Sequence, residues 1–351
     1  MAEKYLTENP AQSIDSIIDS LNADKVLIIT DTNVEKAVLP KLKDSEVVSA
    51  SPKISITPGE DGKNLDTVTK IWDKLEESGA TRRSVVLNIG GGVVTDIGGF
   101  AAATFKRGIR TVNFPTSLLG AVDAATGGKT GINFKGLKNE IGAFHLPENV
   151  IISSLPFATL SRDEILSGYA EMVKTAIISD RDFYISLLEL EKVVNDPRLL
   201  GESVAKCVEI KEEVVSQDPL EKGLRKILNF GHTAGHAFES IGFDSGHPVT
   251  HGKAVAHGML VGLILSHIIL GLDSNEVNHY SSFLKEHYSG ALMRCNDMKA
   301  AIQKMNSDKK NHKFGEPVFT LLNNIGEPEI NCQPTQEEIT EALELYIDII
   351  G

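Results

Sequence analysis

The sequence predicts an α/β N-terminal domain followed by an all-α C-terminal domain. In the first half, short apolar runs alternate with stretches of helical apolar spacing, which indicates βαβ units. In the second half, helical patterns follow one another with few strand signals between them. The length of 351 residues is also more than one ordinary hydrophobic core needs. We therefore expect two domains, residues 1–158 and 159–351.

The N-terminal domain is predicted from apolar runs that end at turn or cap residues. The first of these strands ends at Asp31, and a later one stops at a glycine triplet. Strands separated by helices in this way are typical of a parallel sheet. The expected strands are Lys25–Thr30, Ser84–Ile89, Thr111–Phe114 and Val150–Ser153, and Leu65–Ser78 is an expected helix.

The C-terminal domain is predicted to consist of helices. One apolar stretch, 254–272, is almost long enough to span a bilayer. It contains His257, Ser266 and His267, which favours a helix buried in a large helical domain. The expected helices are Arg162–Ile178, Ser203–Gln217, His232–Ile241, Gly252–Leu270 and Glu337–Ile349.

Composition narrows the class of protein. The hydrophobic fraction of 41% and the charged fraction of 24% are typical of a globular enzyme. A formal net charge of −13 argues against general nucleic-acid binding, although a local cluster of Lys and Arg could still hold an acidic substrate. The three cysteines form no Cys-x-x-Cys pair, and the N-terminus has no apolar signal-peptide core. We expect a cytoplasmic protein with no membrane or nucleic-acid partner.

A glycine triplet at the end of a predicted strand is a candidate nucleotide loop. Gly90, Gly91 and Gly92 would let the backbone approach a pyrophosphate, and the following helix N-terminus favours negative charge. Asp96 lies further along the same segment. The spacing differs from the usual Gly-x-Gly-x-x-Gly pattern, and a glycine triplet on its own is also common in tight turns.

A carboxylate and two histidines form the strongest metal candidate. Glu171 and Lys174 stand three residues apart on a predicted helix, and His232 and His236 stand four apart on another, so each pair shares a helix face. Together with His251, Glu171 and His232 would supply one carboxylate and two imidazoles. That set leaves open positions for substrate oxygens and is typical of catalytic Zn²⁺. Each histidine, taken alone, could also be an ordinary packed or surface residue.

Basic residues are scattered along the chain rather than gathered in solvated runs. Lys129 lies between glycines, where its backbone and its ammonium group could both reach a ligand, and Arg225 precedes an apolar turn. Cations of this kind, with a metal site and a nucleotide loop, point to an anionic substrate and to redox or elimination chemistry. The basic residues considered are Lys106, Arg107, Lys129, Lys138, Lys174, Lys211, Arg225, Lys309 and Lys310.

At these residues the chain resembles the 3-dehydroquinate synthase family, and the resemblance runs over nearly all of the sequence. The shared motifs are long and occur in the family's order. They are Gly90–Asp96, Gly99–Thr104, Arg107–Gly108, Pro115–Leu119, Asp123, Gly127–Asn133, Lys138–Asn139, Gly168–Lys174, Leu228–Ala237 and His251–Gly252.

The resemblance implies a homodimeric enzyme of the shikimate pathway that uses NAD and Zn²⁺, with Co²⁺ as a substitute. Its reaction would convert 3-deoxy-arabino-heptulosonate 7-phosphate to 3-dehydroquinate and phosphate. By the same resemblance, Glu171, His232 and His251 would be the metal ligands. The implied NAD-binding residues are Asp31, Asn33, Glu60, Lys63, Gly90, Gly91, Gly92, Asp96, Thr116, Ser117, Lys129, Lys138 and Thr159.

The resemblance also implies substrate-binding and catalytic positions. The phosphate pocket would comprise Lys129, Asn139, Asn229, His236 and one of Lys309 and Lys310, with Arg107 reaching it from the partner subunit. Lys211 and Arg225 would hold the carboxylate and neighbouring hydroxyls, and Asp123 and Lys174 would lie beside the reacting hydroxyl.

The sequence departs from the family pattern in two places. Thr95 stands where the family often has glycine, and the segment 237–250 is a few residues longer. The longer segment leaves His247 as an alternative third metal ligand, although Pro248 makes a regular helix between His247 and His251 unfavourable.

Two other enzyme classes are alternatives to this reading. One is another sugar-phosphate cyclase, and the other is a metal-dependent oxidoreductase of the glycerol dehydrogenase type. Lys211, Arg225 and Asn229 favour the dehydroquinate reaction over that of another cyclase. A dehydrogenase of that type would have no use for so many phosphate-directed cations.

Overall fold

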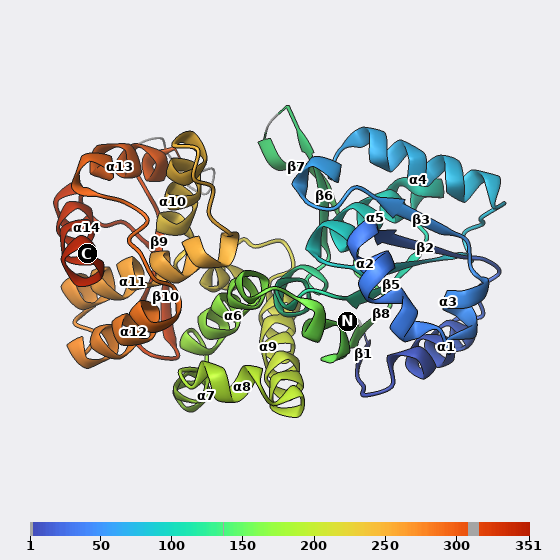
Figure 1. Cartoon of the computed structure of the whole chain (residues 1–351). Helices are drawn as coiled ribbons and strands as arrows, with labels where there is room; N and C mark the ends of the chain where they lie inside the picture. The colour runs from blue at the N-terminus through green and yellow to red at the C-terminus, as the bar shows by residue number, and fades with distance from the viewer. Residues whose placement is uncertain (1–2, 136, 308–315) are drawn as a thin grey trace. The chain divides into compact units, whose positions relative to one another are not determined.

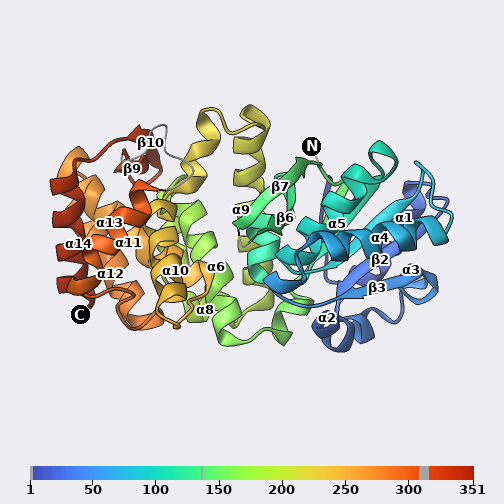
Figure 2. The ribbon, with the colours of Figure 1, turned by 90° about the horizontal axis from the view of Figure 1, so that it is seen from above.

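The computed structural model describes residues 3–135, 137–307 and 316–351. Contacts divide the chain into two compact units, shown in Figures 1 and 2. The first comprises Met1–Ser161 and Val194–Glu212, and the second comprises Arg162–Val193 and Glu213–Gly351. A domain boundary near residue 158 stays a prediction, because a unit defined by contacts need not fold alone.

The first unit is built on a parallel sheet with the strand order β1-β8-β5-β4-β2-β3. Its central strands are mostly buried because both faces of the sheet are covered, and every residue of β4 is buried. The strands are β1 (Glu3–Leu6), β2 (Val26–Asp31), β3 (Lys53–Ile56), β4 (Val85–Gly90), β5 (Arg110–Pro115) and β8 (Asn149–Ile152).

Alternate strand residues enter two separate hydrophobic cores. Ile28 and Leu87 belong to one core and Leu27 and Val86 to the other, as the side-chain period of a strand requires. Figure 1 shows α4 and α5 on one side of the sheet and α1 and α3 on the other. The helices of this unit are α1 (Pro10–Ser20), α2 (Thr32–Ala37), α3 (Glu46–Ala50), α4 (Leu65–Glu77), α5 (Gly92–Thr104) and most of α9 (Pro197–Gln217).

The predicted strands and helices of this unit are confirmed, with ends that shift by a residue or two; α9 begins earlier than the predicted Ser203. Strands β6 (Lys129–Phe134) and β7 (Leu137–Phe144) form an antiparallel hairpin that is separate from the parallel sheet. Short helical turns in the chain are Leu39–Leu42, Glu60–Gly62, Phe105–Arg107, Gly120–Ala124, Leu155–Thr159, Leu224–Asn229 and Cys295–Asp297.

The second unit is helical, as predicted, and α11 lies at its centre. Helices α6, α10, α12 and α14 and strand β9 all contact α11. The helices are α6 (Arg162–Ile177), α7 (Arg181–Leu187), α8 (Leu190–Val194), α10 (His232–Asp244), α11 (His251–Leu270), α12 (Ser274–His287), α13 (Met298–Asn306) and α14 (Gln336–Ile350). The prediction of an all-α half omitted the hairpin of β9 (Phe319–Asn324) and β10 (Glu327–Cys332).

Helix α11 is long and apolar enough to cross a membrane by length and composition. Its mean hydropathy is 1.7, and 72% of its most apolar window is buried inside the structure. Helices that are apolar on all sides are common in the cores of large domains. The contacts of α11 with its neighbours therefore agree with the sequence-based expectation of a buried helix.

Glycines allow the helices around α11 to approach closely. A Cβ on Gly252 would lie 1.9 Å from the carbonyl oxygen of Ser167 on α6, and a Cβ on Gly258 would lie 2.1 Å from that of Gly231. Gly231 precedes α10 with a φ of 77°, a conformation that favours glycine. The absence of side chains at these positions allows α11 to lie close to α6 and to the start of α10.

Candidate functional site

A buried carboxylate on α6 is the centre of the candidate metal site. Glu171 is 1% exposed, and the Nζ atom of Lys174 lies 2.5 Å from its Oε2 atom. Burial raises the pKa of Glu171, but Lys174 and the neighbouring histidines lower it well below its ordinary value. The carboxylate is therefore ionised and attracts cations.

His232 is the first residue of α10, and its ring is oriented by the backbone. The Nδ1 atom lies 3.2 Å from the carbonyl oxygen of Phe230, which can only accept a hydrogen bond. The proton of a neutral ring is therefore on Nδ1, and Nε2 carries the lone pair. This Nε2 lies 3.6 Å from Oε1 of Glu171.

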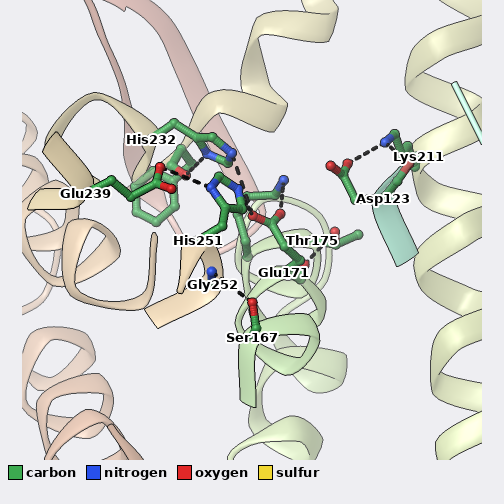
Figure 3. A network of polar contacts seen from close by, with 11 residues as sticks. Asp123, Ser167, Glu171, Thr175, Lys211, His232, Glu239, His251 and Gly252 are labelled. Carbon is green, nitrogen blue, oxygen red and sulfur yellow. Dashed lines mark hydrogen bonds and ion pairs between the residues drawn. The ribbon is translucent and has the colours of Figure 1, made fainter. Parts of the chain in front are cut away.

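His251 is the first residue of α11, and a second carboxylate orients its ring. Its Nδ1 lies 3.2 Å from Oε2 of Glu239 on α10, and its Nε2 lies 3.3 Å from Oε1 of Glu171. Figure 3 shows the ring of His251 between the two carboxylates. Burial lowers the pKa of His251, but Glu171 and Glu239 more than reverse this and raise it to about 10.

Glu171, His232 and His251 together fit a divalent metal ion. One ligand atom from each lies within 4.8 Å of the others. Lys174 pairs with Oε2 of Glu171, whereas Oε1, which faces the Nε2 atoms of both histidines, has no hydrogen-bond donor of normal geometry among the described residues. A buried carboxylate oxygen in this position is costly unless a cation satisfies it. One carboxylate and two imidazole Nε2 atoms suit Zn²⁺ or Co²⁺.

The alternative ligand His247 lies elsewhere. His247 is exposed, and its backbone N–H donates to the carbonyl of Gly242 at the end of α10. After α10 ends at Asp244, the chain turns at Gly246, whose φ is 75°. Among the described residues, the group that contains Glu171 includes His251 rather than His247.

His236 lies beside the metal candidates on the same face of α10. Its ring centroid is 5.5 Å from that of His232 and 6.3 Å from that of His251. His236, Glu239 and His251 also form a second group of possible ligands within 4.8 Å of one another. The first group is the more buried of the two.

The glycine triplet lies where a parallel strand passes into a helix. β4 ends at Gly90, Gly91 caps α5, and α5 begins at Gly92. A Cβ on Gly91 would lie 3.0 Å from the Oγ atom of Ser117, and the backbone N–H of Thr116 donates to the carbonyl of Gly90. The structure thus brings Thr116 and Ser117 to the glycine loop. A helix N-terminus with unsatisfied N–H groups suits a pyrophosphate.

Asp96 lies on α5 beside a buried lysine. Burial raises the pKa of Asp96 to about 6, although Lys63 acts in the opposite direction. The Nζ atom of Lys63 lies 2.5 Å from Asp96 and donates to Oδ1 of Asn139 at 2.6 Å. Thr95, the departure from the family pattern, fits within α5 and donates its hydroxyl to the carbonyl of Gly92.

The turn that carries Lys63 also holds the β6–β7 hairpin. Oε2 of Glu60 accepts a hydrogen bond of 2.7 Å from Nδ2 of Asn133, and the carbonyl of Lys63 accepts from the Asn133 backbone. Oδ1 of Asn133 accepts in turn from the backbone of Asn139, whose φ is 55°. Glu60, Lys63 and Asn139 are thus neighbours. The family resemblance implies that Glu60 and Lys63 bind NAD and that Asn139 binds the phosphate of the substrate.

Asp31 and Asn33 lie where β2 passes into α2. Oδ1 of Asp31 accepts hydrogen bonds from the backbone N–H groups of Asn33 and Val34, so Asp31 caps α2. This contact gives Asp31 a structural role of its own. Its expected place at the adenosine end of NAD stays a prediction, as does that of Asn33.

Lys211 and Asp123 form a close pair in the first unit. Lys211, 7% exposed on α9, donates to the Asp123 carboxylate and, at 2.5 Å, to its backbone carbonyl. Figure 3 shows the contact between the two side chains. Asp123 lies in the helical turn Gly120–Ala124, which follows Ser117. The pairing joins two residues that are 88 positions apart in the sequence.

The loop before α10 holds Arg225 and Asn229. Arg225 is 3% exposed and donates to the carbonyl of Pro219, and its backbone N–H donates to Asp218. Asn229 donates its Nδ2 to Oε1 of Glu221 at 2.8 Å, and Glu221 has a φ of 57°. Glu221 was not predicted as a site residue, because nothing in the sequence spacing of this loop distinguishes it.

Other expected site residues are more exposed. Lys129 and Lys138 lie on β6 and β7, and Thr159 donates its hydroxyl to the carbonyl of Pro156. Arg107 is exposed and has a φ of 66°, following Lys106 at 50°. Consecutive left-handed residues other than glycine are strained, and such strain often occurs at functional sites. Lys309 and Lys310 lie outside the described residues.

The sequence analysis also missed Glu239, although a signal was present. Glu239 follows His232 by seven residues and His236 by three, so all three side chains share one face of α10. What the sequence could not reveal is that this face meets the start of α11.

Comparison with known proteins agrees with this geometry. The model of the 3-dehydroquinate synthase N-terminal domain matches residues 53–167, and that of the 3-dehydroquinate synthase C-terminal domain matches residues 168–311. The chain is 43% identical over 338 residues to a 3-dehydroquinate synthase from Parabacteroides distasonis, covering 96% of each chain. It is 38% identical over 343 residues to one from Pyrococcus abyssi, covering 98% of this chain and 97% of that one.

A solved structure of similar fold is 2-epi-5-epi-valiolone synthase from Streptomyces hygroscopicus subsp. jinggangensis, with NAD⁺ and Zn²⁺ bound. It is 26% identical, with a TM-score of 0.85 over 99% of this chain and 97% of that chain. The matched models together span most of the sequence, and the relatives match it nearly end to end. This chain belongs to the 3-dehydroquinate synthase family.

Proposed function

We propose that this chain converts 3-deoxy-arabino-heptulosonate 7-phosphate to 3-dehydroquinate and inorganic phosphate, as an NAD- and metal-dependent carbon–oxygen lyase. The observation that carries the proposal is the buried Glu171 carboxylate, which faces the Nε2 atoms of His232 and His251. The Nδ1 atoms of both rings already have acceptors, so each ring would bind an ion through Nε2, and at His251 the ion would replace the Nε2 proton. The resident ion would be Zn²⁺ or Co²⁺.

Buried cations support an anionic substrate. Lys174, Lys211 and Arg225 are 2%, 7% and 3% exposed, whereas basic side chains are normally solvated. A dehydrogenase of the glycerol dehydrogenase type acts on uncharged alcohols and would have little use for them. We assign Lys211 and Arg225 to the substrate carboxylate and its neighbouring hydroxyls, and Asp123 and Lys174 to the reacting hydroxyl.

The bound groups would supply the redox chemistry. NAD would accept a hydride from a secondary alcohol of the substrate and later return it, while the metal ion would hold that alcohol and acidify it. Glu171, His232 and His251 would hold the ion. The glycine loop with Thr116 and Ser117 would hold the pyrophosphate, and Asp96 would accept hydrogen bonds from the nicotinamide ribose.

The remaining site residues are proposed from the family resemblance. Asp31, Asn33, Glu60, Lys63, Lys138 and Thr159 would complete the NAD site. The phosphate of the substrate would be held by Lys129, Asn139, Asn229, His236 and Lys309 or Lys310. Charge-assisted hydrogen bonds to the phosphate would stabilise it as a leaving group and keep the substrate in one orientation.

We further propose that the enzyme is a cytoplasmic homodimer in which Arg107 acts on the phosphate bound to the partner subunit. The exposed position of Arg107 supports this role, because an exposed basic side chain is accessible to a partner subunit, and its left-handed backbone is of a kind that often occurs at functional sites. Exposed apolar side chains on the β6–β7 hairpin, at Phe134, Ile141 and Phe144, support a subunit interface.

The test follows the hydride and the phosphate together. The assay uses the heptulosonate phosphate as substrate and an NAD concentration well below the substrate concentration. Over many turnovers, we expect the amount of inorganic phosphate released to equal the amount of substrate consumed. No NADH absorbance should accumulate, because the hydride leaves the substrate and returns. Accumulation of NADH in step with substrate loss would contradict the proposal and favour the dehydrogenase class.

A second arm separates related cyclases. Other heptulose and hexose phosphates lack the carboxylate that Lys211 and Arg225 are proposed to hold. We expect turnover of these substrates to be far slower than that of the heptulosonate phosphate. Faster phosphate release from a sugar phosphate without a carboxylate would assign the chain to a different cyclase activity.

A further inference from the structure

Glu239 on α10 contacts a metal-ligand candidate but is not itself in the proposed ligand set. Its Oε2 atom lies 3.2 Å from Nδ1 of His251, while Nε2 of the same ring lies 3.3 Å from Oε1 of Glu171. An imidazole has only two nitrogen atoms, so both are engaged by carboxylates. In Figure 3 Glu239 and Glu171 lie on opposite sides of the ring.

We propose that Glu239 is a positioning residue that fixes the tautomer and orientation of His251 and thereby strengthens metal binding. The inference rests on the proposed metal site of Glu171, His232 and His251. A carboxylate that accepts the Nδ1–H of a ligating histidine holds the ring in place and increases the electron density on Nε2. Removing such a partner typically weakens metal binding about ten- to hundredfold.

The Nδ1 partner of His251 comes from a different helix. His251 is the first residue of α11, whereas Glu239 lies on α10. His232 is held differently, because its Nδ1 contacts the carbonyl of Phe230, two residues away. The orientation of His251 therefore depends on a side chain from another helix.

The position of Glu239 on α10 explains how one helix serves both histidines. Glu239 lies seven residues after His232, which is two helical turns, so the two side chains share a face. α10 thus supplies one ligand directly and the support for a ligand on α11. The close approach of α10 and α11 at Gly258 makes this arrangement possible, since a Cβ there would collide with Gly231.

The same residues could be read as a second metal site, because His236, Glu239 and His251 also lie within 4.8 Å of one another. A neutral imidazole has one lone pair, so His251 cannot bind one ion through Nε2 and another through Nδ1 without losing both protons. Glu171 is 1% exposed and Glu239 is 19% exposed, so the cost of leaving a carboxylate without a cation is greater at Glu171. The geometry favours one ion, bound at the Nε2 side of the His251 ring, with Glu239 at the Nδ1 side.

The first test is metal affinity, measured by competition between the protein and a chelator for Zn²⁺ and, separately, for Co²⁺. We expect Glu239→Ala to weaken binding about ten- to hundredfold and Glu239→Gln to fall between it and the parent, because the amide oxygen can accept the hydrogen bond without the charge. Asp244→Asn is the matched control. It removes a carboxylate of the same helix that pairs with Lys304, and it should bind as the parent does.

The second test reports on His251 itself. In the zinc-loaded parent with ¹⁵N-labelled histidine, the Nδ1–H of His251 should give a downfield resonance protected from exchange by the Glu239 carboxylate. That resonance should be lost in Glu239→Ala and kept in Asp244→Asn. If Glu239→Ala unfolds at the same temperature as the parent, loss of this resonance cannot be explained by unfolding of the variant. If Glu239→Ala does not fold, Glu239→Gln carries both measurements: its affinity should fall below that of the parent, and its Nδ1–H resonance should move upfield because a neutral amide oxygen replaces the carboxylate.

Three outcomes would overturn the inference. Parent affinity in both Glu239 variants would mean that the contact does not support metal binding. Loss of binding as complete as in Glu171→Ala would make Glu239 a direct ligand. Two ions per chain in the parent and one in Glu239→Ala would make the second group a metal site of its own. Unchanged metal binding in Glu171→Ala, by contrast, would reject the proposed metal site and not only the role of Glu239.

Discussion

At the scale of single residues, the site depends on which atoms of each side chain are already engaged. His232 and His251 both present Nε2 to Glu171, because a carbonyl holds the Nδ1 of one and a carboxylate holds that of the other. Neither orientation follows from the presence of a histidine. The surrounding acceptors turn two imidazoles and one carboxylate into a set that can bind an ion.

Asp96 gives a prediction about pH. Burial raises its pKa to about 6, so the carboxylate is ionised above pH 6 and protonated below it. If the ionised form accepts hydrogen bonds from the ribose of NAD, affinity should fall as the pH drops. Between pH 7 and pH 5 we expect the Kd for NAD to rise about tenfold, as a single titration with this pKa requires. The measurement is NAD binding by calorimetry at several pH values.

Substitution separates Asp96 from other titrating groups. Asp96→Asn should bind NAD more weakly at pH 7 and should lose the pH dependence between 7 and 5. Asp66→Asn, an exposed residue at the start of α4, is the control and should keep it. A parent Kd that stays constant over this range would show that Asp96 does not contact the cofactor as an anion.

At the scale of secondary-structure elements, close helix approaches place the metal ligands. Gly252 lets the start of α11 lie against Ser167 on α6, and its backbone N–H donates to the Ser167 hydroxyl at 3.1 Å. Ser167 lies one helical turn before Glu171. The contact therefore sets the position of His251 along the axis of α6, relative to Glu171. The metal site therefore depends on a residue that contributes no ligand.

Gly252→Ala tests this dependence. The added Cβ would lie 1.9 Å from a backbone oxygen, so the helices must separate. We expect a loss of about 1–3 kcal/mol in the free energy of unfolding, the usual cost of overpacking, and weaker Zn²⁺ binding because His251 moves from Glu171. Denaturant unfolding and chelator competition measure the two effects. Gly201→Ala is the control, since its Cβ would meet Leu6 at an ordinary 3.5 Å.

A buried histidine joins α11 to α14 and predicts a pH dependence of stability. Nε2 of His257 donates to the carbonyl of Tyr288, and Nδ1 accepts from the hydroxyl of Tyr346. Burial lowers the pKa of His257 from 6.5 to about 4. The folded state therefore binds fewer protons than the unfolded state, and stability that is present above pH 6.5 is lost as the pH falls towards 4.

The expected loss from His257 is about 2 kcal/mol between pH 7 and pH 5, at 1.36 kcal/mol for each unit of separation. Urea unfolding of the parent and of His257→Gln at both pH values measures it, and the variant should lose less stability on acidification. Other groups titrate in this range, so the difference between the two proteins is what counts. His279→Gln is the control, because His279 is 54% exposed. An equal loss in His257→Gln and the parent would contradict the assignment.

At the scale of the whole molecule, the proposed role of Arg107 in a partner's site predicts complementation between two inactive variants. Arg107→Ala keeps its metal ligands, and Glu171→Ala keeps its arginine. A mixed dimer would contain one complete site, made of the metal ligands of one chain and the arginine of the other. Random mixing of chains makes half of the dimers mixed, so about a quarter of the parent activity should return.

Co-expression with two affinity tags isolates the mixed dimers, and phosphate release measures their activity. Each variant alone should have little activity. No recovery in a purified mixed dimer would place Arg107 in its own subunit's site. A single-chain mass in solution for the parent would reject the homodimer itself.

The sequence by itself determined the fold class and most elements of secondary structure. Continuous apolar runs predict buried parallel strands, and this held for β2, β4, β5 and β8 because both sheet faces are covered. Helical periodicity predicted α4, α6, α10, α11 and α14, since the period of a helix is a local property of the chain. The ordered motifs also identified the family, as the comparisons confirm.

The tertiary structure alone decided which side chains meet. Lys63 with Asn139, Lys211 with Asp123, and Glu239 with His251 are pairs joined by packing of elements distant in sequence. It also placed His251 rather than His247 beside Glu171, because glycines at the helix contacts set how closely α6, α10 and α11 approach. Periodicity specifies the face of each helix, but only the packed core specifies which faces oppose one another.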